Sequence, residues 1–187
     1  MEARHIKSEE IKENDFGSAY TDKKYKSIVY TSSRDGSTGK DYDAWTGLNF
    51  TDLWATTQDR KGSWSTPILF AGENINTKVN EGPATLNPKG NLLYFTRCGV
   101  AKKKRLGCEL YISKKEGTDW GFPELIPLNA DSFTVGQPSL TDNELELYFA
   151  SDMNGGYGGK DIWVAKRTKK NKAFDKPENL GPTVNTS

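Results

Sequence analysis

The segment 147–164 reads LYFASDMNGGYGGKDIWV and carries the pattern on which the fold prediction rests. An apolar run ending in the small residue Ala150 comes first, a loop with four glycines follows, and a second apolar run begins at Asp161. Short runs of aromatic and β-branched residues on either side of a glycine-rich turn are typical of two antiparallel strands. The segment therefore predicts a hairpin with strands at 147–150 and 161–164.

The same pattern occurs three times along the chain. Runs that combine an acidic, an aliphatic and an aromatic residue lie at 52–54, 109–111 and 161–163. Four other landmarks accompany each run in the same order: a turn with glycine (17–20, 82–85, 136–139), an apolar strand (28–31, 93–96, 147–150), an aromatic residue three before a proline (Trp64, Trp120, Phe174) and a triplet centred on asparagine (75–77, 128–130, 184–186). Such agreement predicts a repeat of about 50 to 65 residues.

Each unit predicts four short antiparallel strands, which is the sequence form of a β-propeller blade. A small sheet cannot bury both of its faces alone, so blades stack face to face. We expect strand aromatics to fill the spaces between blades rather than to bind a ligand: Trp54, Tyr94, Phe95, Tyr148, Phe149 and Trp163. The predicted fold class is all-β, with three four-stranded antiparallel blades, almost no helix, and membership of a larger or oligomer-completed propeller.

The predicted units are 15–80 with an inserted loop near 36–50, then 81–135 and 136–187, and residues 1–14 are the end of a preceding repeat or a tag. The chain starts and stops at the same point of the repeat. Closed propellers have about four to eight blades. We therefore expect either a piece of a longer protein or two copies that together complete a six-bladed ring.

The composition restricts the function. The chain has 26 Lys and Arg against 25 Asp and Glu, a net charge of +1, which argues against binding nucleic acid or a membrane through bulk charge. The longest apolar runs are too short to span a membrane, and we expect no signal peptide because the N-terminus lacks an apolar segment. A single histidine, His5, nearly excludes a histidine-based triad or a multi-histidine metal site.

Two cysteines, Cys98 and Cys108, lie at equal distances from residue 103 in the predicted hairpin of the second unit. In a symmetric antiparallel register they face each other, at a separation that a small adjustment makes suitable for a disulfide. We predict a disulfide, which fits an oxidising compartment. Two reduced thiols in a cytosolic protein remain the alternative.

Several loops contain residues that could carry chemistry. The acids of segment 35–43 fit neither the calcium-loop pattern nor the Asp-box of sialidases, so turn formation explains them best. The basic segment 101–105 lacks interleaved aromatics and is interpreted as a solvated hairpin tip. We predict no catalytic residue, metal or cofactor.

Exposed loop residues are the candidates for contact with a partner. The glycine-rich segment 155–160 lacks the following Ser or Thr and the helix of a phosphate-binding loop, so it is interpreted as a hairpin turn. The predicted partner-binding residues are Tyr157 and Lys160 in this turn, and Tyr42 and Trp45 in the inserted loop.

The third unit, at 147–164 and 176–186, resembles the WD40-like PD40 repeat. This variety resembles the periplasmic propellers of OmpA-family envelope proteins of Bacteroidetes, including the PorE-like component of the type IX secretion system. The second unit departs from the pattern at 97–99 and 106–108, where Ser-Asp-x-x-Gly-Gly is expected. The resemblance implies a non-catalytic scaffold for envelope proteins, located in the periplasm and associated with the outer membrane through its parent protein.

A second hypothesis is a propeller that binds or hydrolyses glycans. Glycosidases need two carboxylates about 5–9.5 Å apart, and the chain offers the acids Asp52, Glu109 and Asp161. Because these acids recur once in every unit, we expect them to cap or pair strands.

Overall fold

The computed structural model describes residues 13–39, 42–43, 47–101, 104–128 and 133–187. Over these ranges the strands form three antiparallel sheets. The same residues contain no helix, and therefore none long and apolar enough to cross a membrane. The predicted all-β class is confirmed.

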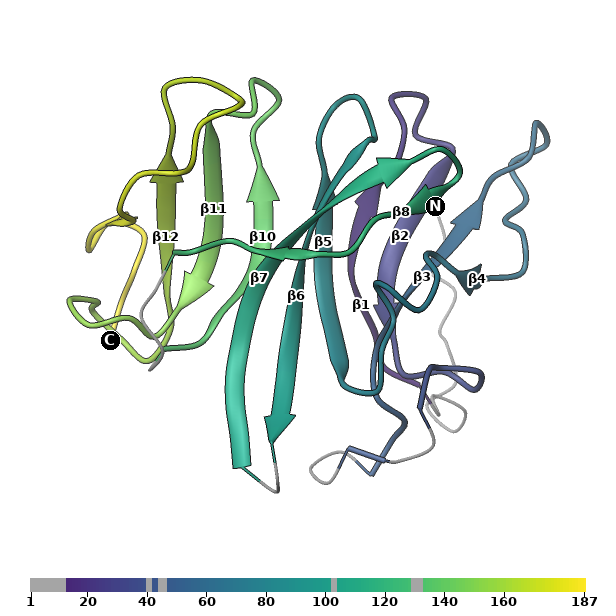
Figure 1. The fold of residues 1–187 in the computed structure, drawn as a ribbon, viewed down its shortest axis with the longest axis horizontal. Coiled ribbons are helices and arrows are strands. Elements are labelled where there is room, and N and C mark those ends of the chain that lie inside the picture. The colour runs from purple at the N-terminus through teal and green to yellow at the C-terminus, as the bar shows by residue number, and fades with distance from the viewer. Residues whose placement is uncertain (1–12, 40–41, 44–46, 102–103, 129–132) are drawn as a thin grey trace, which may run out of the picture.

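Each sheet follows the order of the chain, so that strands adjacent in sequence are hydrogen-bonded neighbours (Figure 1). The first sheet consists of β1 (Asp15–Tyr20), β2 (Ser27–Ser32), β3 (Asp52–Thr57) and β4 (Ile68–Leu69). The second consists of β5 (Asn80–Leu86), β6 (Leu92–Ala101), β7 (Lys104–Glu116) and β8 (Asp119–Trp120), and β9 (Glu124–Leu125) also pairs with β7. The third consists of β10 (Val135–Leu140), β11 (Glu146–Ser151), β12 (Asp161–Lys166) and β13 (Glu178–Asn179).

The first strand of every sheet contains an irregularity at the turn noted in the sequence. The register shifts between Phe16 and Ala19 in β1, between Glu81 and Ala84 in β5, and between Gly136 and Ser139 in β10. The strand pairing shows that the alignment of Gly17 with Gly82 and Gly136 is wrong by one residue. Phe16 lies opposite Thr31 as Gly136 lies opposite Ala150, so Phe16 and not Gly17 occupies the position of Gly136.

The second sheet lies between the other two and is covered on both faces (Figure 1). Successive residues of a strand point to opposite faces, and Tyr94 and Phe95 on β6 accordingly enter different hydrophobic clusters. The cluster with the first sheet contains Val29, Leu53, Ile75, Ala84, Leu93, Phe95 and Trp120. The cluster with the third sheet contains Tyr94, Leu110, Ile126, Leu128, Val135, Leu147, Phe149, Trp163 and Ala165.

Four of the six aromatics predicted to fill the space between sheets belong to these clusters. The other two are Trp54 and Tyr148, which lie on the outward faces of the first and third sheets. Trp54 is nevertheless buried, because the guanidinium of Arg34 lies over its ring and over that of Tyr30, 5.3 and 5.2 Å from the ring centroids.

The asparagine of the repeated triplet holds the third strand at its outer edge. Asn76 accepts a hydrogen bond from the Leu53 N–H (2.9 Å) and donates one to the Leu53 carbonyl (3.1 Å). Asn185 makes the same pair of bonds with Ile162, at 2.7 and 3.0 Å. The counterpart in the second unit, Asn129, lies outside the described residues. A buried amide thus replaces the fourth strand where the short β4 and β13 have ended.

A threonine on the second strand marks the contact between neighbouring sheets. Thr96 Oγ1 accepts a hydrogen bond of 2.9 Å from the Gln137 N–H of the next sheet. Its counterpart Thr31 is fully buried, but Pro83 stands at the position of Gln137 and has no N–H to donate. Among the described residues, Thr31 Oγ1 has no hydrogen-bond partner.

This difference predicts opposite effects for the same substitution at the two threonines. Thr31→Val should raise the free energy of unfolding or leave it unchanged. Valine has nearly the shape of threonine and lacks the hydroxyl that is buried without a partner. Thr96→Val should lower it by about 1–3 kcal/mol, because the Gln137 N–H loses its partner. Urea unfolding of both variants measures the difference, and equal losses of stability would contradict the assignment.

Candidate binding cavity

The first strands of the three sheets converge, with β5 in contact with both β1 and β10. At one end of these strands lies a cavity of about 320 Å³ to which all three sheets contribute. Its lining consists of Asn14, Phe16, Ser33, Asp43, Asn49 and Thr51 from the first sheet and the segments beside it, Asn80, Gly82, Pro83, Thr96, Cys98 and Cys108 from the second sheet, and Thr134, Gly136, Gln137, Ala150 and Lys160 from the third sheet and the segments beside it.

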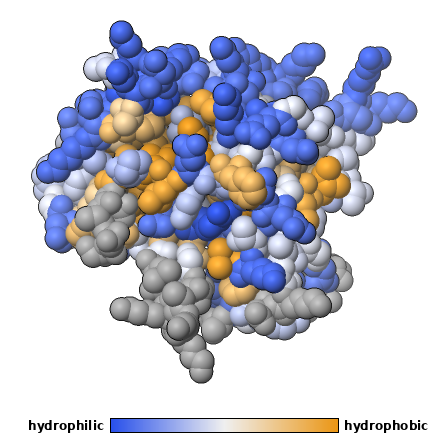
Figure 2. Space-filling view, in the orientation of Figure 1, coloured by the Kyte–Doolittle hydropathy of each residue, from blue (hydrophilic) through white to orange (hydrophobic). Residues whose placement is uncertain are grey.

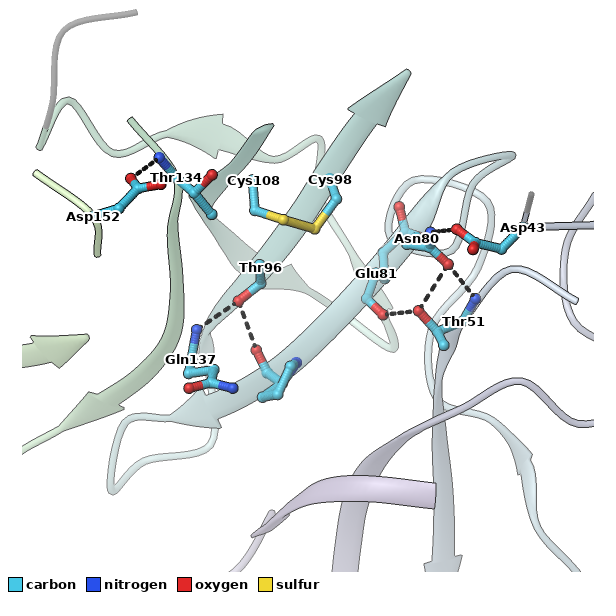
Figure 3. The surroundings of a disulfide bond; sticks show 11 residues. Asp43, Thr51, Asn80, Glu81, Thr96, Cys98, Cys108, Thr134, Gln137 and Asp152 are labelled. Atoms are coloured by element: carbon cyan, nitrogen blue, oxygen red, sulfur yellow. Dashed lines mark hydrogen bonds between the residues drawn. A yellow bond between two sulfur atoms is a disulfide. The ribbon is translucent and has the colours of Figure 1, made fainter. Parts of the chain in front are cut away.

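The disulfide Cys98–Cys108 forms part of the cavity wall (Figure 3). The two cysteines are directly paired across β6 and β7, with a Cα–Cα separation of 4.0 Å. The two cysteines therefore face each other as predicted, although the register shifts by one residue between this pair and the tip of the hairpin. The bond crosslinks the hairpin of the second sheet immediately beyond the pair Arg97 and Glu109.

Buried aspartates take the place of the disulfide in the two outer sheets. Asp52 accepts a hydrogen bond from the Thr38 N–H. Asp161 accepts hydrogen bonds from the N–H groups of Tyr157 and Gly158. These acids cap the loop that precedes their own strand, which explains why an acid recurs there. In the second sheet Glu109 instead accepts a hydrogen bond from the Tyr111 hydroxyl (3.0 Å), and the disulfide holds the loop.

A set of side-chain amides and hydroxyls is fixed on the side of the first sheet (Figure 3). Asn80 Oδ1 accepts hydrogen bonds from the N–H and the hydroxyl of Thr51, at 2.9 and 3.2 Å. Asn80 Nδ2 donates to Asp43 Oδ2 (2.9 Å), and the Thr51 hydroxyl donates to the Glu81 carbonyl (2.7 Å). This wall is thus ordered by bonds among its own polar groups.

The side of the third sheet offers a free amide. Gln137 has a positive φ of 58°, and its N–H is held by Thr96. Its exposed side-chain amide makes no hydrogen bond with any described residue, although it lines the cavity. A ligand could therefore use both the donor and the acceptor of this amide.

The structure distributes the four predicted partner-binding residues unevenly. Lys160 lines the cavity. Tyr42 is exposed and pairs with Asn49, a lining residue, but does not itself line the cavity. Tyr157 is half exposed on the loop before β12 and also lies outside the lining. Trp45 falls outside the described residues.

Sequence reasoning missed the most distinctive cavity residue. Phe16 is exposed and lines the cavity, at a position where the third unit has Gly136. An added Cβ at Gly136 would lie 3.1 Å from Thr96 Cγ2, so a side chain at that position would require Thr96 to shift. Phe16 was missed because Gly17 was aligned with Gly136. An alignment based on strand pairing identifies Phe16 as the counterpart.

Two acids near the cavity are buried and titrate unusually. Desolvation by burial raises the pKa of Asp52 to about 6, and the hydrogen bond from Thr38 lowers it only in part. Desolvation also raises the pKa of Glu81 to about 7, although hydrogen bonds from Thr77 and the nearby Arg97 lower it. Glu81 contacts Arg97 Nε at 2.9 Å and the Thr77 hydroxyl at 2.7 Å. Among the described residues, no group of three or more His, Cys, Asp or Glu is arranged to hold a metal ion.

Comparison with known proteins gives the fold but no family. No family model matches the chain, and no curated protein matches it. Among solved structures it is similar to a puromycin-hydrolysing peptidase from Mycobacterium tuberculosis, with 14% sequence identity and a TM-score of 0.50. The similarity covers 91% of this chain and 24% of the peptidase, so the chain spans about a quarter of that protein. At this identity the likeness shows the fold alone.

The raised pKa values predict that stability decreases as pH rises through mildly acidic values. Between 3.8 and about 6, Asp52 holds its proton in the folded protein and has lost it in the unfolded chain, so the free energy of unfolding falls over this window. The share of Asp52 is at most about 3 kcal/mol. Glu81 acts in the same direction between 4.5 and about 7.

Urea unfolding at pH 4, 5, 6, 7 and 8 measures this dependence. Asp52→Asn keeps an acceptor for the Thr38 N–H and removes the titrating group, so its stability should decline less steeply than that of the unsubstituted protein. Parallel curves for the two proteins would contradict the assignment.

Proposed function

We propose that the three sheets are propeller blades and that the chain is a non-catalytic module that binds a segment of another protein in the cavity. Two features support the blade assignment: the first three strands of every sheet follow one another as an antiparallel meander, and the first strands converge while the sheets pack face to face. The observation that carries the binding proposal is the cavity itself, which all three sheets line.

The lining suits an extended peptide. Phe16, Pro83, Ala150 and the disulfide provide apolar surface for one buried side chain. The Gln137 amide beside them can bond the donor and the acceptor of a main-chain peptide group. The cavity is rigid, because hydrogen bonds, a crosslink and capped loops hold its walls, and rigid walls reduce the entropy lost on binding.

The titratable groups of the cavity support binding rather than catalysis. Within the described lining, the carboxylate belongs to Asp43 and the amine to Lys160, and the two cysteines are oxidised. Asp43 accepts a hydrogen bond from Asn80, and this bond orients its carboxylate. Glycan binding is the second candidate, because an exposed aromatic ring beside side-chain amides also suits a sugar.

We further propose a bacterial envelope location. A disulfide in the wall of the cavity fits an oxidising compartment such as the periplasm. The resemblance of the third unit to PD40 repeats supports envelope proteins as partners, with a role in an OmpA-family or type IX secretion-associated assembly that links to the outer membrane through a parent protein. The near-zero net charge favours neither nucleic acid nor direct membrane insertion.

The role of the disulfide is testable by replacing both cysteines. Cys98→Ser with Cys108→Ser should lower the free energy of unfolding by about 2–3 kcal/mol, because the unfolded chain regains the freedom that the crosslink removes. Reduction of the unsubstituted protein with dithiothreitol serves as the matched measurement. An unchanged urea midpoint in both cases would show that the crosslink contributes nothing.

Binding in the cavity is testable with two small probes. N-acetyl-leucine methylamide represents a peptide, and N-acetylglucosamine represents a sugar with the same acetamide group. Each probe is titrated into ¹⁵N-labelled protein. The peptide probe should move the amide signals of Thr96 and Gln137. Movement with the sugar alone would favour the glycan candidate, and no movement with either would contradict the proposal.

Matched variants locate the site. Gln137→Ala should weaken binding of the peptide probe about fivefold to tenfold, through the loss of about 1 kcal/mol in hydrogen bonding. Asn171→Ala removes another exposed side-chain amide, in the loop after β12, and should leave binding unchanged. Phe16→Ala should weaken binding, whereas Phe122→Ala, which removes another exposed ring, should not.

A further inference from the structure

The two formed contacts between sheets follow one rule. At the first contact, the second sheet presents the face that carries Leu93 and Phe95 to Val29 and Leu53 of the first sheet. At the second contact, the third sheet presents its corresponding face, with Leu147 and Phe149, to Tyr94 and Leu110 of the second. The later sheet always presents the face with the aromatic cross-strand pair, Phe95 with Tyr111 or Phe149 with Trp163.

By this rule each outer sheet has one open face, and the two open faces are of opposite kind. The first sheet leaves open its aromatic-pair face, with Tyr30 opposite Trp54. A hollow of about 410 Å³ on this face is lined by Ile28, Tyr30 and Trp64 among others. Trp64 is 46% exposed, whereas its counterpart Trp120 is 7% exposed in the formed contact.

The third sheet leaves open the complementary face. Ile162 is 39% exposed, although its counterparts Leu53 and Leu110 are 0% and 1% exposed in the two formed contacts. Val184 is 54% exposed, although its counterparts Ile75 and Leu128 are 0% and 6% exposed. Two positions whose counterparts are buried in both formed contacts are thus exposed on this face. Figure 2 shows the molecule from the side on which all three sheets are seen, where apolar patches lie below a hydrophilic upper edge.

Polar groups complete the formed contact between the first and second sheets. Arg97 pairs with Glu81 and donates hydrogen bonds across the contact to the carbonyls of Asn74 (3.1 Å) and Ile75 (2.8 Å). Thr77 donates to Glu81 from the other side, through its N–H (3.0 Å) and its hydroxyl (2.7 Å).

The first sheet has a similar pair, in which the arginine is as buried as Arg97 but the acid is half exposed. Arg34 bonds Asp15 at 2.9 Å, and Asp15 occupies the strand position of Glu81. Arg34 lies over Tyr30 and Trp54 as Arg97 lies over Phe95 and Tyr111. The groups that would complete this arrangement are the Val184 carbonyl and Thr186, which the third sheet exposes as the counterparts of Ile75 and Thr77.

We propose that two copies of this chain associate reciprocally, with the third sheet of each packed on the first sheet of the other. Ile162 and Val184 of one copy fill the hollow at Trp64 of the other. Arg34 donates a hydrogen bond to the Val184 carbonyl, and Asp15 accepts one from Thr186. Because each copy has one face of each kind, two such contacts close the assembly at six sheets, within the usual range for a propeller. This inference rests on the packing between sheets and is independent of what the cavity binds.

The oligomeric state of the intact chain tests the proposal. Sedimentation equilibrium at 1–100 µM should give the mass of two chains. A mass of one chain throughout this range, or an open series of larger polymers, would overturn the closed dimer. Ile162→Glu should raise the dissociation constant at least tenfold, whereas Phe122→Glu, on another exposed ring outside both faces, should leave it unchanged. Circular dichroism establishes that each variant is folded, and Val184→Glu replaces Ile162→Glu if that variant is not.

Mixing two variants tests the reciprocal geometry. Ile162→Glu alters only the third-sheet face, and Trp64→Glu alters only the first-sheet face. Each variant alone should be monomeric, and an equimolar mixture should dimerise, because one unaltered contact forms between the two. Failure to dimerise on mixing would overturn the pairing of unlike faces.

A crosslink identifies the contact itself. Asp15→Cys with Thr186→Cys places a thiol on each face, at positions whose counterparts are in contact, because the Thr77 hydroxyl donates a hydrogen bond of 2.7 Å to Glu81 Oε1. Mild oxidation should give a covalent species of twice the chain mass. Asp175→Cys with Thr186→Cys moves one thiol away from the face and should not. Equal crosslinking in both variants would overturn the proposed contact.

Discussion

A sheet of four short strands has two faces and too little material to bury both, and this constraint governs the rest of the structure. The second sheet meets it by placing Tyr94 in one hydrophobic cluster and Phe95 in the other. Adjacent residues of one strand thus serve two different neighbours. The arrangement of the three sheets follows, because each sheet stacks on the next through corresponding faces and the first strands converge.

Convergence of the first strands leaves little room, and the backbone irregularities accommodate it. The glycine at position 136 allows β10 to approach Thr96, and Gln137 donates its N–H to the same threonine. Where the repeat carries Pro83 instead, that bond is lost and Thr31 remains unsatisfied. The cavity lies where the strands diverge beyond this contact, and Phe16 occupies space that a glycine leaves empty in the third unit.

The sequence was sufficient to predict the strands, their meander order and the pairing of Cys98 with Cys108, because alternation and turn chemistry are local. It could not predict the cavity, since Phe16, Asn80 and Gln137 lie on three different sheets and come together only after these have packed. It also misplaced Phe16 by one residue. A glycine is needed at such a bend only when another residue lies close, as the Thr96 side chain does at Gly136, and sequence spacing does not contain that information.

The buried pair of Glu81 and Arg97 shows why apolar stacking alone is insufficient. Desolvation makes such a pair costly, as the pKa of Glu81, raised to about 7, indicates. The aliphatic and aromatic side chains beside it could pack in several registers, whereas the bonds from Arg97 to the Asn74 and Ile75 carbonyls fit one. The pair therefore fixes alignment between sheets at some cost in stability. The Arg34–Asp15 pair has the same design with its acid half exposed, and it would fix the alignment of an opposing sheet that belongs to another copy.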